Sequence, residues 1–176
     1  MNSSLHDFWS DRMRLYLSMM DQVNNYLRFL LFMIVAAILI CLGLQVLTRY
    51  VIEQPLSWTG EVSRYLMVWM TFIGASLCIR YHRLIRVEVI LMKLRPKQIM
   101  FIHMFAGVVS IFFYGMLIYL GIQITGILSL QQSPALQIPM YIPYLSVPIG
   151  GFLMICNTIA ALIDSYLSIE GGPESS

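Results

Sequence analysis

The sequence predicts an all-α, polytopic membrane protein with four transmembrane helices, and three observations indicate this fold class. Of the 176 residues, 59% are hydrophobic and 11% are charged, whereas a soluble globular domain carries roughly 25% charged residues. The mean hydropathy is +0.75. The apolar residues gather in runs, and about 20 apolar residues are needed to cross a hydrocarbon core. We therefore divide the chain into membrane spans.

The first two spans are marked by the absence of charge. Residues 29–48 carry no charged side chain and form the first predicted helix. The second predicted helix covers residues 58–79. Its uncharged run alone is too short to span the membrane, so the helix is extended toward the N-terminus. Ser57 then serves as the N-cap, and Glu61 lies in the favourable first turn of the helix. This places Glu61 and Arg64 at the membrane interface.

The last two spans share a long stretch without Asp, Glu, Lys or Arg. A polar and proline-rich segment divides it, because such a segment cannot continue a lipid-facing helix. The segment contains Gln131, Gln132, Ser133, Pro134, Gln137, Pro139, Pro143 and Pro148. The third helix is predicted over residues 98–129, with Pro96 in its first turn, and the fourth over 145–163. Residues 164–176 form a short tail.

Two amphipathic helices are expected outside the four-helix membrane domain, which covers residues 29–163. Residues 1–28 alternate apolar and polar residues with helical spacing, which is typical of a helix in the membrane interface or against a partner. Its apolar stripe consists of Trp9, Met13, Tyr16, Met20, Val23 and Leu27. A shorter amphipathic helix is predicted over Leu84–Leu94, between the second and third spans.

The basic residues predict the orientation. Nine of the eleven precede the first span or lie between the second and third, and only Arg49 and Arg64 lie on the other side. By the positive-inside rule, both termini are cytoplasmic and the loop around Pro134 faces outward. No cleavable signal peptide is recognisable, so the first span is expected to target the chain to a bacterial inner membrane.

Several kinds of function are disfavoured by the residues. A net charge of +2 does not suggest a nucleic-acid surface, and no catalytic, cofactor or metal site is predicted. Cys41, Cys78 and Cys156 lie in apolar runs and are interpreted as packing residues. His103 is the only histidine within a span, whereas a membrane cytochrome needs axial ligands to iron. No ionisable residue lies near mid-membrane, where a transporter that moves ions usually keeps one.

The most informative stretch runs from Gln45 to Glu88. An ordinary outer loop would explain its charges but not its ordered series of motifs. Glu61 and Arg64 lie three apart on one helical face and can pair, and Trp69 is expected at a protein contact. The motifs are Arg49-Tyr50, the segment Pro55–Tyr65 with Pro55, Trp58, Thr59, Glu61 and Arg64, then Gly74-Ala75, Arg80 and the segment Leu84–Glu88 with Arg86.

This series resembles the small membrane subunit, of the DctQ type, of tripartite ATP-independent periplasmic (TRAP) transporters. The resemblance extends over nearly the whole chain, including the four helices and the proline-rich third loop. Three positions depart from the family pattern. Gly60 stands where an acid is common, and Leu84 and Glu88 replace a His and an Asp.

The resemblance implies a non-enzymatic scaffold subunit of a Na⁺-coupled importer of an organic acid. Its expected partners are a large DctM-type permease subunit, a periplasmic DctP-type binding protein and membrane lipids, with no cofactor. The chain would brace the large subunit and help to form the docking surface for the binding protein. Two alternatives remain: a membrane anchor of a redox complex and a small self-sufficient exporter. The residues expected at partner interfaces are Arg49, Tyr50, Pro55, Trp58, Glu61, Arg64, Trp69, Arg80, Arg86 and Glu88.

Overall fold

Helices account for nearly all of the described chain. The computed structural model describes residues 3–51, 53, 56–81 and 96–170. In order, its elements are α1 (Ser3–Tyr50), α2 (Ser57–Arg80), α4 (Pro96–Ile127), the 3₁₀ turn η1 (Leu128–Leu130), α5 (Tyr141–Tyr144) and α6 (Ser146–Glu170). Four stretches of these helices are long and apolar enough to cross a membrane: Arg12–Tyr50, Ser57–Arg80, Met104–Leu130 and Tyr141–Asp164. The predicted all-α class with four spans is confirmed.

The first helix is longer than its predicted span. Residues 29–48 are part of α1, which also includes nearly all of the expected N-terminal amphipathic helix without a break. No proline occurs in α1 and its first glycine is Gly43, so nothing in the sequence interrupts the backbone hydrogen bonds. With 48 residues, α1 is about 72 Å long at 1.5 Å per residue. It is therefore more than twice as long as a hydrocarbon core of about 30 Å is thick.

Helix ends differ from the predictions by a few residues. The expected N-cap, Ser57, is the first residue of α2, and Leu56 occupies the cap position without a capping side chain. Glu61 consequently lies beyond the first turn, where it reaches a distant loop. The fourth span begins earlier than predicted, because the short helix α5 precedes α6. Pro96 does begin α4, as expected from its fixed φ.

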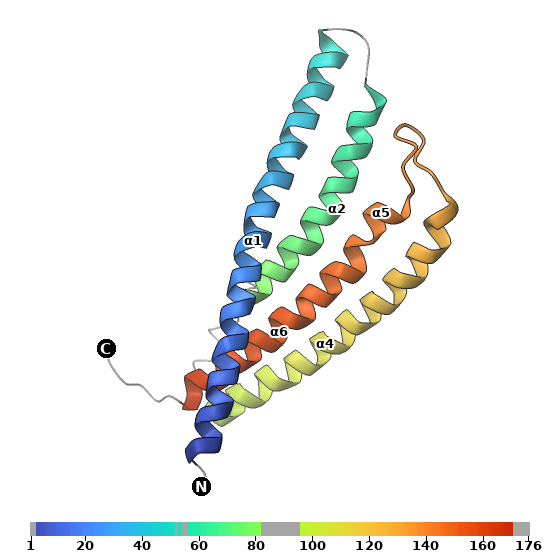
Figure 1. Ribbon diagram of the computed structural model, residues 1–176. Helices are drawn as coiled ribbons and strands as arrows, with labels where there is room; N and C mark the ends of the chain where they lie inside the picture. Colours follow the sequence, from blue (N-terminus) through green and yellow to red (C-terminus); the bar gives the residue numbers. More distant parts are fainter. Residues whose placement is uncertain (1–2, 52, 54–55, 82–95, 171–176) are drawn as a thin grey trace.

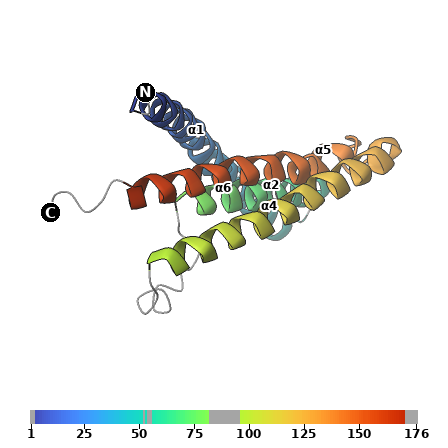
Figure 2. The same ribbon diagram turned by 90° about the horizontal axis from the view of Figure 1, so that it is seen from below.

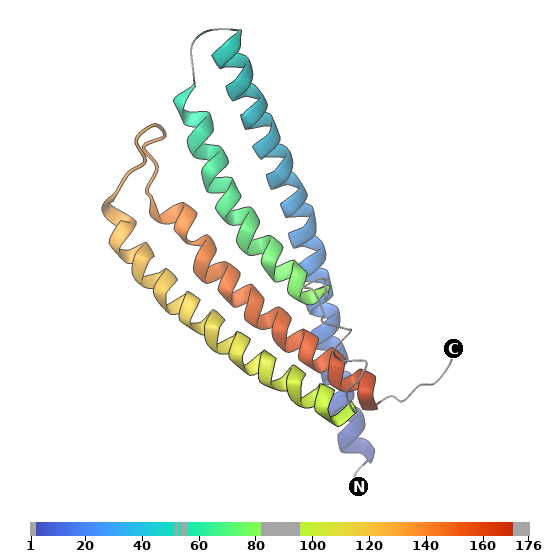
Figure 3. The ribbon, with the colours of Figure 1, turned by 180° about the vertical axis from the view of Figure 1, so that it is seen from behind.

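The four long helices form a fan in which each contacts its neighbours in the order α1, α2, α6 and α4 (Figure 1). The same order is seen from behind in Figure 3. Viewed from below, the N-terminal part of α1 diverges from the paired α4 and α6 (Figure 2). The C-terminal end of α1, the start of α2 and the connection between α4 and α5 lie at one end of the fan, which we call the loop end.

Packing within the fan relies on small residues and on one apolar cluster. Ile34 and Ile38 of α1 pack against Ile73 and Leu77 of α2. Between α2 and α6 the backbones approach closely at Gly150, where an added Cβ would lie 2.5 Å from Cβ of Phe72. Interfaces of this kind, built on small residues, are typical of membrane helices.

The outer helices leave much of their apolar surface uncovered. In the most apolar window of each span, 6% of the α1 residues and 11% of the α4 residues are buried, compared with 39% for the last span. Large apolar side chains such as Phe32, Leu39, Phe105 and Phe112 are more than 60% exposed. The fold therefore offers apolar faces to lipid or to another protein.

Candidate interaction site

A narrow loop at the loop end folds back toward α2. Gln132 and Pro139 form an isolated antiparallel bridge, and the amide of Ser133 donates to the carbonyl of Ile138 at 2.9 Å. Gln137 closes the turn by donating to the carbonyl of Ser133 at 3.0 Å, with φ of 51°. We call residues 131–140 the hairpin loop. Its prolines explain why α4 cannot continue here.

The hairpin loop encloses the carboxylate of Glu61. The hydroxyl of Ser133 donates to Oε2, and the backbone amides of Ala135 and Leu136 donate to Oε1 and Oε2 at 3.1 and 3.2 Å. Charge-assisted bonds of this type are stronger than neutral ones. Glu61 therefore fastens α2 to a loop more than seventy positions later in the chain.

Arg64 does not form the predicted contact pair with Glu61. No ion pair between these two side chains is found, and Glu61 is turned toward the hairpin loop. The reason is competition, since three donors of the loop surround the carboxylate. Arg64 is exposed beside the loop, on the same helix face as Glu61.

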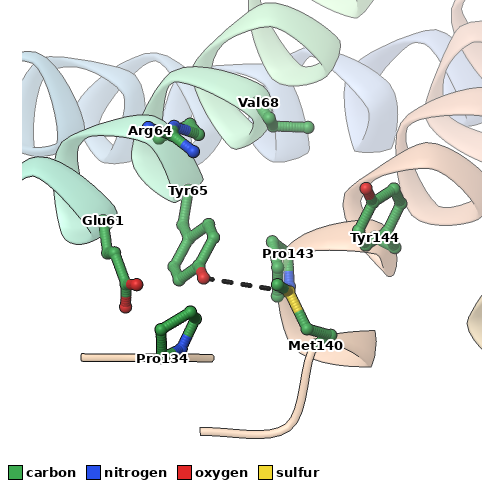
Figure 4. A pocket seen from close by; sticks show the side chains of 8 residues that line it. All are labelled: Glu61, Arg64, Tyr65, Val68, Pro134, Met140, Pro143 and Tyr144. Atoms are coloured by element: carbon green, nitrogen blue, oxygen red, sulfur yellow. Dashed lines mark hydrogen bonds between the residues drawn. The ribbon is translucent and has the colours of Figure 1, made fainter. Parts of the chain in front are cut away.

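Glu61 and Arg64 line a pocket of about 290 Å³ between α2 and α5 (Figure 4). Its wall is completed by Tyr65, Val68, Pro134, Met140, Pro143 and Tyr144. The hydroxyl of Tyr65 donates to the sulfur of Met140 at 3.8 Å. We refer to this feature as the loop-end pocket. It combines a guanidinium and a carboxylate with aromatic and apolar walls.

The other predicted interface residues are scattered. Arg49 and Tyr50 lie exposed at the end of α1, with Cζ of Arg49 5.8 Å from the centroid of the Tyr50 ring. Trp58 is exposed near the start of α2. Trp69 packs instead on the apolar cluster between α1 and α2, so its protein contact is made within this chain. Pro55, Arg86, Glu88 and the predicted helix Leu84–Leu94 lie outside the described residues.

Arg80 makes contacts within the chain, at the end opposite to the loop end. Its guanidinium lies 2.7 Å from Oδ1 of Asp21 in α1 and 3.4 Å from Oδ2 of Asp164 in α6. The side chain of Arg80 is 9% exposed, whereas both carboxylates are about half exposed. Arg80 thus joins three helices.

Next to Arg80, two fully buried asparagines join the same three helices. The amide of Asn24 donates to Asn157 at 2.7 Å, and the amide of Asn157 donates back at 3.0 Å. Asn157 also donates to the backbone carbonyl of Ser76 at 3.0 Å. We call Asp21, Asn24, Ser76, Arg80, Asn157 and Asp164 the three-helix junction. Reading the sequence missed it, although an uncharged asparagine in the middle of a predicted span is a detectable signal.

Among the residues described, no three His, Cys, Asp or Glu side chains are grouped so as to hold a metal ion. Cys41, Cys78 and Cys156 are free thiols, and Cys78 is exposed. The arrangement of both regions is suited to holding helices and loops in position and to contacting other molecules.

Comparison with known proteins identifies relatives of this chain. The family described as "Tripartite ATP-independent periplasmic transporters, DctQ component" matches residues 37–167. A protein of Haemophilus influenzae named as a TRAP transporter small permease is 36% identical over 74 residues, which cover 42% of this chain and 46% of that protein. The isethionate TRAP transporter permease protein DctMQ of Oleidesulfovibrio alaskensis is 32% identical over 102 residues, covering 55% and 16%. The matched segments span less than half the length of these relatives.

Proposed function

This chain belongs to the DctQ component family of tripartite ATP-independent periplasmic transporters, and we propose that it is the scaffold subunit of a Na⁺-coupled importer of an organic acid. In this proposal it braces a large DctM-type permease subunit in the bacterial inner membrane. Its loop end faces the periplasm and contributes to the docking surface for a DctP-type binding protein. Transport of the substrate and of Na⁺ takes place in the large subunit.

One observation carries the scaffold proposal: the fan leaves the apolar faces of α1 and α4 largely uncovered. A helix that buries so little of its own apolar surface is well suited to packing against other membrane helices. The relative named DctMQ carries the designations of both the DctM and the DctQ component in the name of one permease protein. This supports the large subunit as the neighbour of this chain.

The placement of charge supports a role outside the transport path. In the described spans, α1 carries no charged side chain between Arg28 and Arg49, and the charged side chains of α2 lie near its ends, with Glu61 and Arg64 near the start and Arg80 at the end. An ion path across the membrane uses ionisable groups deep within it. The polar groups buried deeper in the fan, Asn24 and Asn157, satisfy each other.

Reconstitution tests this proposal. Proteoliposomes are prepared with this chain alone, with the large subunit alone and with both, and uptake of the acid bound by the cognate binding protein is measured under an inward Na⁺ gradient. We expect uptake only with both subunits and the binding protein present. Uptake by this chain alone, or by the large subunit alone at the full rate, contradicts the scaffold role.

A further inference from the structure

The loop-end pocket contains one cation, Arg64, which interacts electrostatically with Glu61 but makes no hydrogen bond or ion pair with it. The three donors of the hairpin loop hold the carboxylate of Glu61. Arg64 lies on the same face, is exposed, and forms no hydrogen bond or ion pair within the part of the chain that the structure describes. Glu61 therefore shapes the pocket, and Arg64 remains available to a ligand.

The chemistry of the pocket favours a carboxylate. A guanidinium presents a planar fork of donors that matches the two oxygens of a carboxylate. In the same pocket, Val68, Met140 and Pro143 provide an apolar wall suited to the methylene groups of a short acidic side chain. The volume of about 290 Å³ is at the lower limit of small-molecule pockets, which begin near roughly 300 Å³.

We propose that the loop-end pocket receives an aspartate or glutamate side chain of the periplasmic binding protein, paired with Arg64. This inference rests on the proposed function and names the contact by which docking would occur. A free organic acid gains little from a single exposed cation in water. A docking protein excludes water around the same pair and so strengthens it.

The position of the pocket also favours a protein. Part of its wall comes from the hairpin loop, which extends beyond the ends of α4 and α5 (Figure 1). Loops positioned in this way by a rigid scaffold commonly carry recognition. The pocket therefore opens where a water-soluble partner approaches the transporter.

The test measures binding of the cognate binding protein to the assembled two-subunit complex in phosphatidylcholine nanodiscs. We expect Arg64→Gln to raise the Kd about tenfold, as for a residue at the centre of a contact, and Arg64→Lys to raise it less. Val68→Phe, which fills the pocket without changing its charge, should also weaken binding. Arg28→Gln is the matched control, since Arg28 is an exposed arginine of α1 that does not line the pocket and is not among the expected interface residues. It should change the Kd by less than about twofold.

A charge exchange identifies the partner residue. Arg64→Glu should abolish binding, and replacing one acidic surface residue of the binding protein by arginine should restore it. Equal losses for Arg64→Gln and Arg28→Gln indicate a diffuse effect of the chain's positive charge and overturn the proposal. A loss that appears only when phosphatidylglycerol is added identifies a lipid headgroup as the occupant, which also overturns it. If the parent complex does not bind the protein at all, the docking function itself is wrong, whereas normal binding by the Arg64 variants refutes only the pocket.

Discussion

Asn24 and Asn157, which are 133 positions apart in the sequence, exchange two amide hydrogen bonds of 2.7 and 3.0 Å in the interior of the fan. Both side chains are fully buried. The pair fixes the point at which α1 crosses α6, because an amide in an apolar surrounding is costly unless it is hydrogen-bonded. A third bond to the carbonyl of Ser76 fixes α2 at the same point.

Removing one member of the pair should destabilise the chain. Asn157→Ala leaves Asn24 without its partner and is expected to cost about 1–3 kcal/mol. The double variant with Asn24→Ala should cost less than the sum of the single variants, with a coupling of about 0.6–1.7 kcal/mol. Unfolding by denaturant in detergent provides the measurement. Asn25→Ala, an exposed neighbour, is the control and should change stability little; additive single effects would refute the coupling.

The hairpin loop should depend on the charge of Glu61. In Glu61→Gln, one acceptor oxygen becomes an NH₂ group that faces backbone donors, so the bonds to Ala135 and Leu136 are weakened. We expect these amides to exchange hydrogen roughly tenfold faster, as in a locally opened segment. Hydrogen-exchange mass spectrometry of the intact complex checks this. Glu53→Gln, at an exposed position outside the loop, should leave the exchange unchanged, and protection that survives in Glu61→Gln would contradict the assignment.

The close approach of α2 and α6 should make Gly150 sensitive to a single methyl group. In Gly150→Ala the new Cβ would lie 2.5 Å from Cβ of Phe72, so the helices must move apart at a cost of about 1–3 kcal/mol. Gly115→Ala is the matched control, because nothing lies within 4 Å of its added Cβ. Thermal unfolding of the two variants is compared. Equal stability would show that the interface adapts freely at Gly150.

The distribution of basic residues predicts the orientation in the membrane. Reporters fused after Ser176 and within residues 83–95 should be active in the cytoplasm, and a reporter near Pro134 should be active in the periplasm. Alkaline phosphatase and a fluorescent protein report on the two compartments. An opposite result at any of the three sites would require a different arrangement of the spans.

The sequence by itself determined the fold class and the approximate spans. A span can be recognised from local sequence alone, because each span is a nearly uninterrupted apolar run and each break between spans is marked by charge or proline. Residues 58–79 lie within α2, and residues 98–129 lie within α4 and η1. The ordered motifs from Arg49 onward were also enough to identify the family, which the comparisons confirm.

Tertiary structure alone decided which side chains meet. Spacing three residues apart predicted that Glu61 pairs with Arg64, yet the hairpin loop brings three donors to Glu61 from a distant part of the chain. Similarly, Trp69 and Arg80 were predicted at partner surfaces from the sequence, and the fold shows contacts that they make within the chain: Trp69 packs on the apolar cluster between α1 and α2, and Arg80 pairs with Asp21 of α1. Helical periodicity specifies which face of its own helix a residue occupies. Which other helix packs against that face is determined by how the apolar helices pack together. That packing places Asn24 beside Asn157, a contact that cannot be inferred from the sequence position of either residue.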